Sequence, residues 1–361
     1  MAQISIKCRL IWTAVPAVLL VVLLAADANG QRGRADSVLS VRGRITLLAA
    51  DGNRAAVSTR VKPGCGRIVV WRGGDKRAIS VKPGILGCAG DGVSQLGLGA
   101  ARVAWIEQGG GNTLELSVKA AKLTGGPGRE LEFATNGDRA GADPAGDWVG
   151  RLFGGGSVLA YNSWTQVCDR PTDEECGQKD PFLRVTDQKL VRVVAGRRAV
   201  IAQGDAAYPL LAVGGSWMAV GTANNLTIRR ANGAETAAIL DPAGSARQVA
   251  LTTTRLAIET TTTLDLHDPA TGAAGKSLPL GAAASLRLVG VSSRLALLRG
   301  PHRLVLVRLS DGKRISFPLG ASAAATLVGG RLTETGLFYA YNTRSAGRIV
   351  FEPTARLLAR F

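Results

Sequence analysis

The sequence predicts an all-β protein, and three observations support this fold class. No long stretch carries apolar residues at helical spacing without a Gly or Thr interruption. Short alternating runs lie instead between turn residues, which is typical of strands. With 46% hydrophobic residues in 361, the chain can also bury a large core and is not a disordered polyelectrolyte, despite its net charge of +17.

A unit of four short strands recurs along the chain. The two clearest copies are adjacent. The first is expected over 247–253, 255–261, 263–268 and 276–280, and the second over 286–291, 294–299, 303–309 and 314–319. Gly- and Asp-containing turns such as 268–272 and 310–312 separate the third strand from the fourth.

An alanine in the second strand of each unit can be followed through the chain. It occurs seven times, as Ala56, Ala104, Ala160, Ala219, Ala257, Ala296 and Ala340. Periods near 40 to 50 residues with four strands each predict a seven-bladed β-propeller of four-stranded antiparallel blades. Six or eight blades are alternatives. A pair of β-sandwiches is the other alternative, against which the sevenfold register argues.

The N-terminus has the pattern of a targeting segment. Lys7 and Arg9 precede an apolar run over 10–26, and Ala26-Asp27-Ala28 places small residues where a signal peptidase cleaves. We therefore expect a signal peptide over 1–28, a disordered mature N-terminus over 29–36 and a single propeller domain over 37–361. The protein would be exported, to the cell envelope, the periplasm or the medium. An uncleaved anchor is the alternative, and no later run reaches spanning length.

The two ends of the domain are expected to meet. Residues 348–352 form the third strand of the last blade, with little chain left afterwards, and 37–41 have no blade of their own. We predict that 37–41 complete the last blade and so fasten the ring.

The cysteines agree with export. Apart from Cys8, four remain, and an even number in an exported chain suggests two disulfides. Proximity in sequence favours Cys65–Cys88 and Cys168–Cys176 among the three possible pairings. A zinc site is the less favoured alternative, because no Cys-x-x-Cys pair is present.

The segment 264–272 (Leu-Asp-Leu-His-Asp-Pro-Ala-Thr-Gly) and the repeated Arg-Leu-Ala strands resemble the bacterial secreted β-propellers of the WD40-like and TolB-like superfamily. The resemblance extends over the expected mature chain. No Gly-His or Trp-Asp dipeptide of true WD40 repeats occurs, which leaves the subfamily open.

Two long insertions, 136–147 and 166–181, are expected to open on the same face of the ring. Residues 136–180 contain eight acids and four bases, opposite in sign to the whole chain. Long loops on a rigid scaffold commonly carry binding residues. The expected binding face consists of Asp138, Asp143, Asp147, Trp148, Tyr161, Trp164, Asp173, Glu174 and Glu175. The alternative for the three aromatic residues is packing between blades.

A Ca²⁺ site is a second interpretation of the acidic loop, with Asp169, Asp173, Glu174 and Glu175 as ligands. Asp-x-Asn-x-Asp spacing is absent, so we favour a solvated loop pinned by a disulfide and expect no other cofactor.

No catalytic constellation is evident. The inner strands expected near 95–99, 210–214 and 286–290 lack carboxylates and histidines, and His267 and His302 have no nucleophilic partner.

We therefore expect a monomeric, non-catalytic binding or scaffold propeller with a protein or cell-envelope partner. A channel-site hydrolase, lactonase or quinone-dependent dehydrogenase is the enzymatic alternative. A binder of anionic envelope polymers is another, since +17 is a strong positive charge. Dispersed bases and few aromatics argue against a nucleic-acid protein.

Overall fold

The computed structural model describes residues 37–62, 65–81, 92–137, 144–171, 176–177, 180–204, 209–222, 225–240, 246–281, 286–317 and 325–361. The expected signal peptide and the segment 29–36 lie outside the described residues. No helix within the described ranges is long and apolar enough to cross a membrane.

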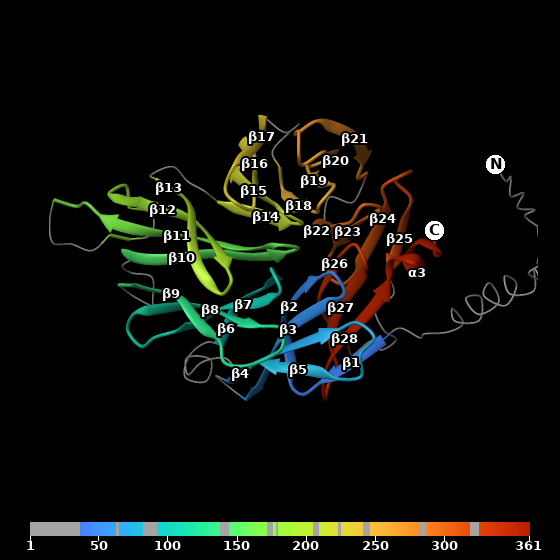
Figure 1. Ribbon diagram of the computed structural model, residues 1–361, viewed down its shortest axis with the longest axis horizontal. Helices are drawn as coiled ribbons and strands as arrows, with labels where there is room; N and C mark the ends of the chain where they lie inside the picture. Colours follow the sequence, from blue (N-terminus) through green and yellow to red (C-terminus); the bar gives the residue numbers. More distant parts are fainter. Residues whose placement is uncertain are drawn as a thin grey trace, which may run out of the picture. The chain divides into compact units, whose positions relative to one another are not determined.

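The first three blades contain the longest strands (Figure 1). Blade one consists of β2 (Arg44–Asp51), β3 (Arg54–Lys62), β4 (Cys65–Arg72) and β5 (Ala78–Val81). Blade two consists of β6 (Gly92–Gly99), β7 (Arg102–Gly109), β8 (Leu114–Lys122) and β9 (Arg129–Asn136). Blade three consists of β10 (Gly146–Gly155), β11 (Val158–Cys168), β12 (Leu183–Val194) and β13 (Arg197–Gly204).

The remaining blades have shorter strands. Blade four consists of β14 (Leu210–Gly214), β15 (Trp217–Thr222), β16 (Asn225–Arg230) and β17 (Glu235–Leu240). Blade five consists of β18 (Gln248–Leu251), β19 (Leu256–Glu259), β20 (Thr263–His267) and β21 (Ala274–Pro279). Blade six consists of β22 (Arg287–Val291), β23 (Leu295–Arg299), β24 (Leu304–Arg308) and β25 (Arg314–Phe317). Blade seven consists of β26 (Thr326–Leu332), β27 (Gly336–Asn342), β28 (Gly347–Pro353) and β1 (Ser37–Val41).

The blades form a closed ring of seven. Inner strands β2, β6, β10, β14, β18, β22 and β26 contact one another in turn, and β26 contacts β2. β1 pairs antiparallel with β28, with Val38 opposite Val350, as expected for a ring fastened by both termini. The predicted fold and the predicted closure are therefore confirmed.

The repeated alanines occupy equivalent places. All seven lie in the second strand of a blade and are fully buried. Ala104, for example, lies between Gly97 of β6 and Ala120 of β8, and Ala257 lies between Ala250 of β18 and Leu266 of β20. A small side chain is required because neighbouring blades pack face to face at this depth.

Glycines allow the inner strands of blades two to five to approach closely. A Cβ atom on Gly154 of β10 would lie 2.5 Å from the Leu98 nitrogen of β6. On Gly214 of β14 it would lie 1.9 Å from the Leu251 oxygen of β18. Both distances are below van der Waals contact, so only glycine fits, and backbone atoms form much of the wall around the axis.

Two features differ from the expected pattern. Blades two and three are joined into one eight-stranded sheet, because Asn136 of β9 pairs with Gly146 of β10. A short helix, α3 (Thr354–Leu358), also follows β28, where Leu357 is buried against blade seven. Neither feature follows from the strand pattern of the sequence.

Candidate functional site

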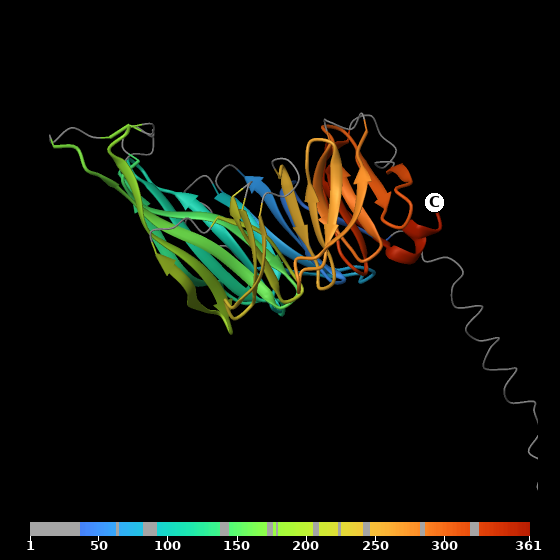
Figure 2. The ribbon, with the colours of Figure 1, turned by 90° about the horizontal axis from the view of Figure 1, so that it is seen from above.

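The hairpin of β11 and β12 forms a ribbon that extends away from the ring (Figures 1 and 2). β9 and β11 both run antiparallel to β10, so the connections 137–145 and 169–182 leave the same face of the ring. The two long insertions were expected to open on one face of the ring, and these connections do so. We call the part of this hairpin beyond residues 166 and 186, which begins at Val167 and ends at Val185, the arm.

The arm is cross-linked at its base. Cys168 and Cys176 form a disulfide, and Cys176 is fully buried. Arg184 pairs with Asp169, and Arg170 pairs with Asp180. The pKa of Asp169 lies below its usual value because of the hydrogen bond from Arg184, so this pair is charged at neutral pH. A two-stranded ribbon is marginally stable by itself, and these contacts compensate for the missing neighbours.

Apolar side chains are exposed along the arm. Val167, Phe182 and Val185 have exposed fractions of 37%, 45% and 41%. Phe133 of β9, whose exposed fraction is 48%, lines the groove described next. Exposed large apolar residues that gather in one region commonly mark an interaction surface.

A groove of about 430 Å³ lies between β9 of blade two and the strands of blade three. Two tryptophans, Trp148 of β10 and Trp164 of β11, lie opposite each other and are half-buried. Their rings are stacked, with centroids 6.4 Å apart and planes 4° apart. The Trp148 Nε1 donates to the Pro144 oxygen at 2.9 Å, which orients the indole.

A β-bulge in β12 supplies a carboxylate to the same groove. Ser163 pairs with Lys189 but Thr165 pairs with Thr186, so two residues of β12 lie opposite Trp164. The bulged Asp187 has φ of +48°, a left-handed conformation that Asp tolerates better than most residues. The Lys189 ammonium lowers the pKa of Asp187 by hydrogen bonding, so Asp187 is ionised at neutral pH.

The groove has a negative lining. Its ionisable residues are Glu130, Glu132, Asp147, Asp187, Lys189 and Arg198. Asp147 accepts from the Thr165 hydroxyl at 2.7 Å, and Glu132 accepts from the Tyr161 hydroxyl at 2.6 Å. Burial raises the pKa of Tyr161, and Glu132 adds to this, so the phenol remains a donor. Four carboxylates against two bases favour a cationic or hydrogen-bond-donating ligand.

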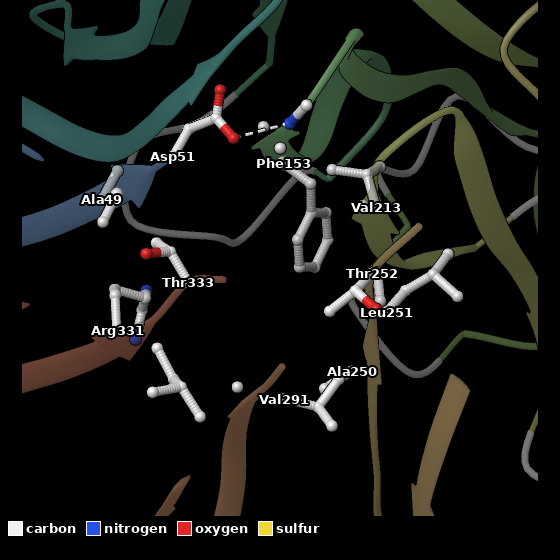
Figure 3. A pocket seen from close by; sticks show the side chains of 18 of the residues that line it. Ala49, Asp51, Phe153, Val213, Ala250, Leu251, Thr252, Val291, Arg331 and Thr333 are labelled. Carbon is white, nitrogen blue, oxygen red and sulfur yellow. Dashed lines mark hydrogen bonds between the residues drawn. The ribbon is translucent and has the colours of Figure 1, made fainter. Parts of the chain in front are cut away.

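The central channel forms a second cavity, of about 420 Å³, lined by all seven inner strands (Figure 3). Asp51 lies at the end of β2, and its Oδ1 accepts from the Gly156 nitrogen of blade three at 2.7 Å. Burial raises the pKa of Asp51, although this hydrogen bond opposes the shift. Arg151, Arg331 and Glu334 also line the channel.

Solved structures show what this arrangement resembles. The β-propeller domain of Cps50 (Swd1) from Myceliophteria thermophila has a TM-score of 0.50 at 14% identity, over 88% of this chain and 99% of that one. The chain has a β-propeller fold. No family model matches the sequence, and no curated protein matches it significantly.

Other propellers of known structure are similar to a lesser degree. A chain of the mitotic checkpoint complex has a TM-score of 0.49 at 14% identity, over 88% of this chain and 94% of that one. Virginiamycin B lyase from Staphylococcus aureus has a TM-score of 0.49 at 9% identity, over 88% and 99%. At these identities the likeness concerns the fold alone.

The propeller brings together three of the residues expected on the binding face. Asp147, Trp148 and Trp164 all line the groove. Tyr161 is fully buried, so its ring packs between the blades and supports the groove from behind, which was the alternative considered for it. Asp138, Asp143, Asp173, Glu174 and Glu175 lie outside the described residues, as does Cys88 of the expected Cys65–Cys88 bond.

Only one of the four expected calcium ligands, Asp169, lies within the described residues. Asp169 is paired with Arg184, and no group of three His, Cys, Asp or Glu side chains in the described ranges is close enough to hold a metal ion. The other three expected ligands, Asp173, Glu174 and Glu175, lie outside those ranges.

Sequence reasoning missed the ionisable residues of the channel. Asp51 and Glu334 lie at the turns that follow β2 and β26, and Arg331 lies near the end of β26. The three inner strands considered in the sequence lack carboxylates and histidines, whereas Asp51 and Glu334 belong to two other blades. The acids beside the first turns of blades one and seven were the signal that could have found them.

Proposed function

We propose that this propeller is an exported, non-catalytic binding or scaffold protein that holds a protein or cell-envelope component between blades two and three. The observation that carries the proposal is the groove with the stacked pair Trp148 and Trp164, which lies at the base of a disulfide-braced arm. Rigid aromatic side chains next to polar groups are typical of residues that dominate binding energy.

The charge of the groove supports a basic partner. The lining has an excess of carboxylates, whereas the whole chain has a net charge of +17. Most of the surface would repel a cationic segment, whereas the groove would attract it. The charge distribution therefore directs such a partner to the groove. Lys or Arg side chains could also stack on the tryptophan faces.

A channel-site enzyme is the second candidate function. Asp51, with its raised pKa, is the observation in its favour, because perturbed carboxyl groups in cavities often act as acids or bases. Against it, Glu334 is bound to the nitrogen and hydroxyl of Ser293, and the described lining includes no His, Cys or Lys to complete a nucleophile and base. We therefore favour the binding function.

Comparative capture tests the binding proposal. The protein and its Trp164→Ala and Asp147→Asn variants are immobilised and exposed to an envelope fraction at low and high salt. Asp311→Asn, which breaks an exposed ion pair in a blade-six turn, is the control. We expect both groove variants to retain at least fivefold less of one component, with the control unchanged. Equal retention by all four proteins would contradict the proposal.

A further inference from the structure

Two arginines lie close to β26, a strand that lines the central channel. Arg331 of β26 is one of the residues that line the channel, and its Nη1 donates to the backbone oxygen of Gly330 at 3.0 Å. Arg299 of β23 reaches the same strand, since its Nη1 lies 3.5 Å from the position that a Cβ on Gly329 would take. One guanidinium group therefore belongs to a residue that lines the 420 Å³ cavity, and a second lies beside the strand that carries it.

The two carboxylates that line the channel, Asp51 and Glu334, are engaged elsewhere, and so is Glu259, which binds the backbone of the lining residue Leu288. Glu259 binds Arg287 at 3.3 Å and the Leu288 nitrogen. Glu334 binds Ser293, and Asp51 binds the Gly156 nitrogen. In the described ranges neither Arg331 nor Arg299 forms an ion pair. The positive charge beside β26 therefore has no counter-ion from these parts of the protein.

This arrangement is energetically unfavourable by itself. Burial lowers the pKa of Arg331, and the charge of Arg299 lowers it further. Arg331 is surrounded by protein but still partly accessible through the channel. Charges held in such surroundings are normally paired, and an anion in the cavity would compensate them. The cavity volume lies within the range of about 300–1,000 Å³ that is usual for small-molecule sites.

We propose that the central channel binds a small oxyanion, the carboxylate or phosphate group of a small molecule, through Arg331 with Arg299 as a second positive charge. A guanidinium group presents parallel N–H donors that match the two oxygens of such a group. The site is separate from the groove between blades two and three, and it does not depend on the function proposed for that groove.

Phosphate binding tests the proposal. Inorganic phosphate is titrated into the protein by calorimetry, with ionic strength held constant by chloride. Arg331→Gln and Arg299→Gln are compared with Arg344→Gln, which removes the same charge from an exposed turn of blade seven. This control is needed because a protein with a net charge of +17 attracts anions over its whole surface.

We expect one saturable phosphate site in the wild type and in Arg344→Gln, and at least tenfold weaker binding in Arg331→Gln. Arg299→Gln should also bind more weakly, and it carries the test if Arg331→Gln does not fold. Without phosphate, Arg331→Gln should melt no lower than the wild type, because an uncompensated charge has been removed. Absence of a saturable site in the wild type, or equal affinity in all four proteins, would overturn the proposal.

Discussion

Ile45 and Asn342 are joined by two hydrogen bonds although 297 positions separate them. The Ile45 nitrogen donates to the Asn342 Oδ1 at 2.7 Å, and the Asn342 Nδ2 donates to the Ile45 oxygen at 2.9 Å. The Asn342 amide, at the end of β27, is thus the hydrogen-bond partner of both backbone polar groups of Ile45 in β2, the first inner strand. This side chain links blade seven to blade one in addition to the pairing of β1 with β28.

Replacement of Asn342 by alanine should therefore destabilise the whole ring. The buried donor and acceptor of Ile45 would both lose their partner, which costs about 2–4 kcal/mol in total. Asn232→Ala, which removes the cap of an exposed turn, should cost about 0.5 kcal/mol. Chemical unfolding of both variants measures the difference. Equal losses would show that Asn342 has no special role in closure.

Glu107 should be indispensable for stability. This buried carboxylate of β7 accepts from the Trp105 Nε1 and from the Lys119 Nζ, each at 2.7 Å. Glu107→Ala would leave a buried ammonium without its counter-ion and should cost about 3–5 kcal/mol. Glu235→Ala, which breaks an exposed pair with Arg229, should cost less than about 1 kcal/mol. A Glu107→Ala protein as stable as Glu235→Ala would refute this assignment.

Asp51→Asn should stabilise the protein at neutral pH. Because the folded pKa of Asp51 lies above 3.8, the folded state binds the proton more tightly than the unfolded state. Its contribution to stability is therefore greatest at low pH and is lost as the pH rises through the folded pKa. The asparagine oxygen can still accept from Gly156. We expect a higher melting temperature than the wild type at pH 7 and no difference at about pH 3. A lower melting temperature at pH 7 would show that the ionised carboxylate is stabilising.

Loss of the Cys168–Cys176 bond should affect the arm and not the ring. The cysteines are only 8 positions apart, so the bond constrains a short loop and contributes at most about 3 kcal/mol. The double variant Cys168→Ser, Cys176→Ser should be cut by trypsin after Arg184 much faster than the wild type, with nearly the same melting temperature. A large drop in melting temperature would indicate that the bond stabilises the entire domain.

The seven blades could be predicted from sequence because each blade has four short strands and requires a small buried residue in the second of them. The strand patterns of blades five and six and the buried alanines from Ala56 to Ala340 follow from alternation and crowding within one unit. The completion of blade seven by β1 could be predicted because the C-terminal segment supplies only three strands of that blade, and the N-terminal strand has no blade of its own.

The groove and the channel depend on relationships that no local pattern encodes. The sequence indicated Trp148 and Trp164, but their stacking depends on the register of β10 with β11. Asp187 faces the groove only because of a bulge in β12, and Glu132 comes from another blade. Arg331 lines the channel and Arg299 reaches the same strand from blade six, an approach that no local sequence motif indicates.

Site-specific photo-crosslinking tests the central claim most directly. A benzophenone side chain replaces Phe133, which is exposed in the groove, or His302, which is exposed on the same face in blade six. After irradiation in the native host, position 133 should give a discrete adduct with one partner, and position 302 should give none. The adduct should disappear when Asp147→Asn and Trp164→Ala are combined. An adduct of equal yield from position 302, or none from position 133, would contradict a binding function for the groove.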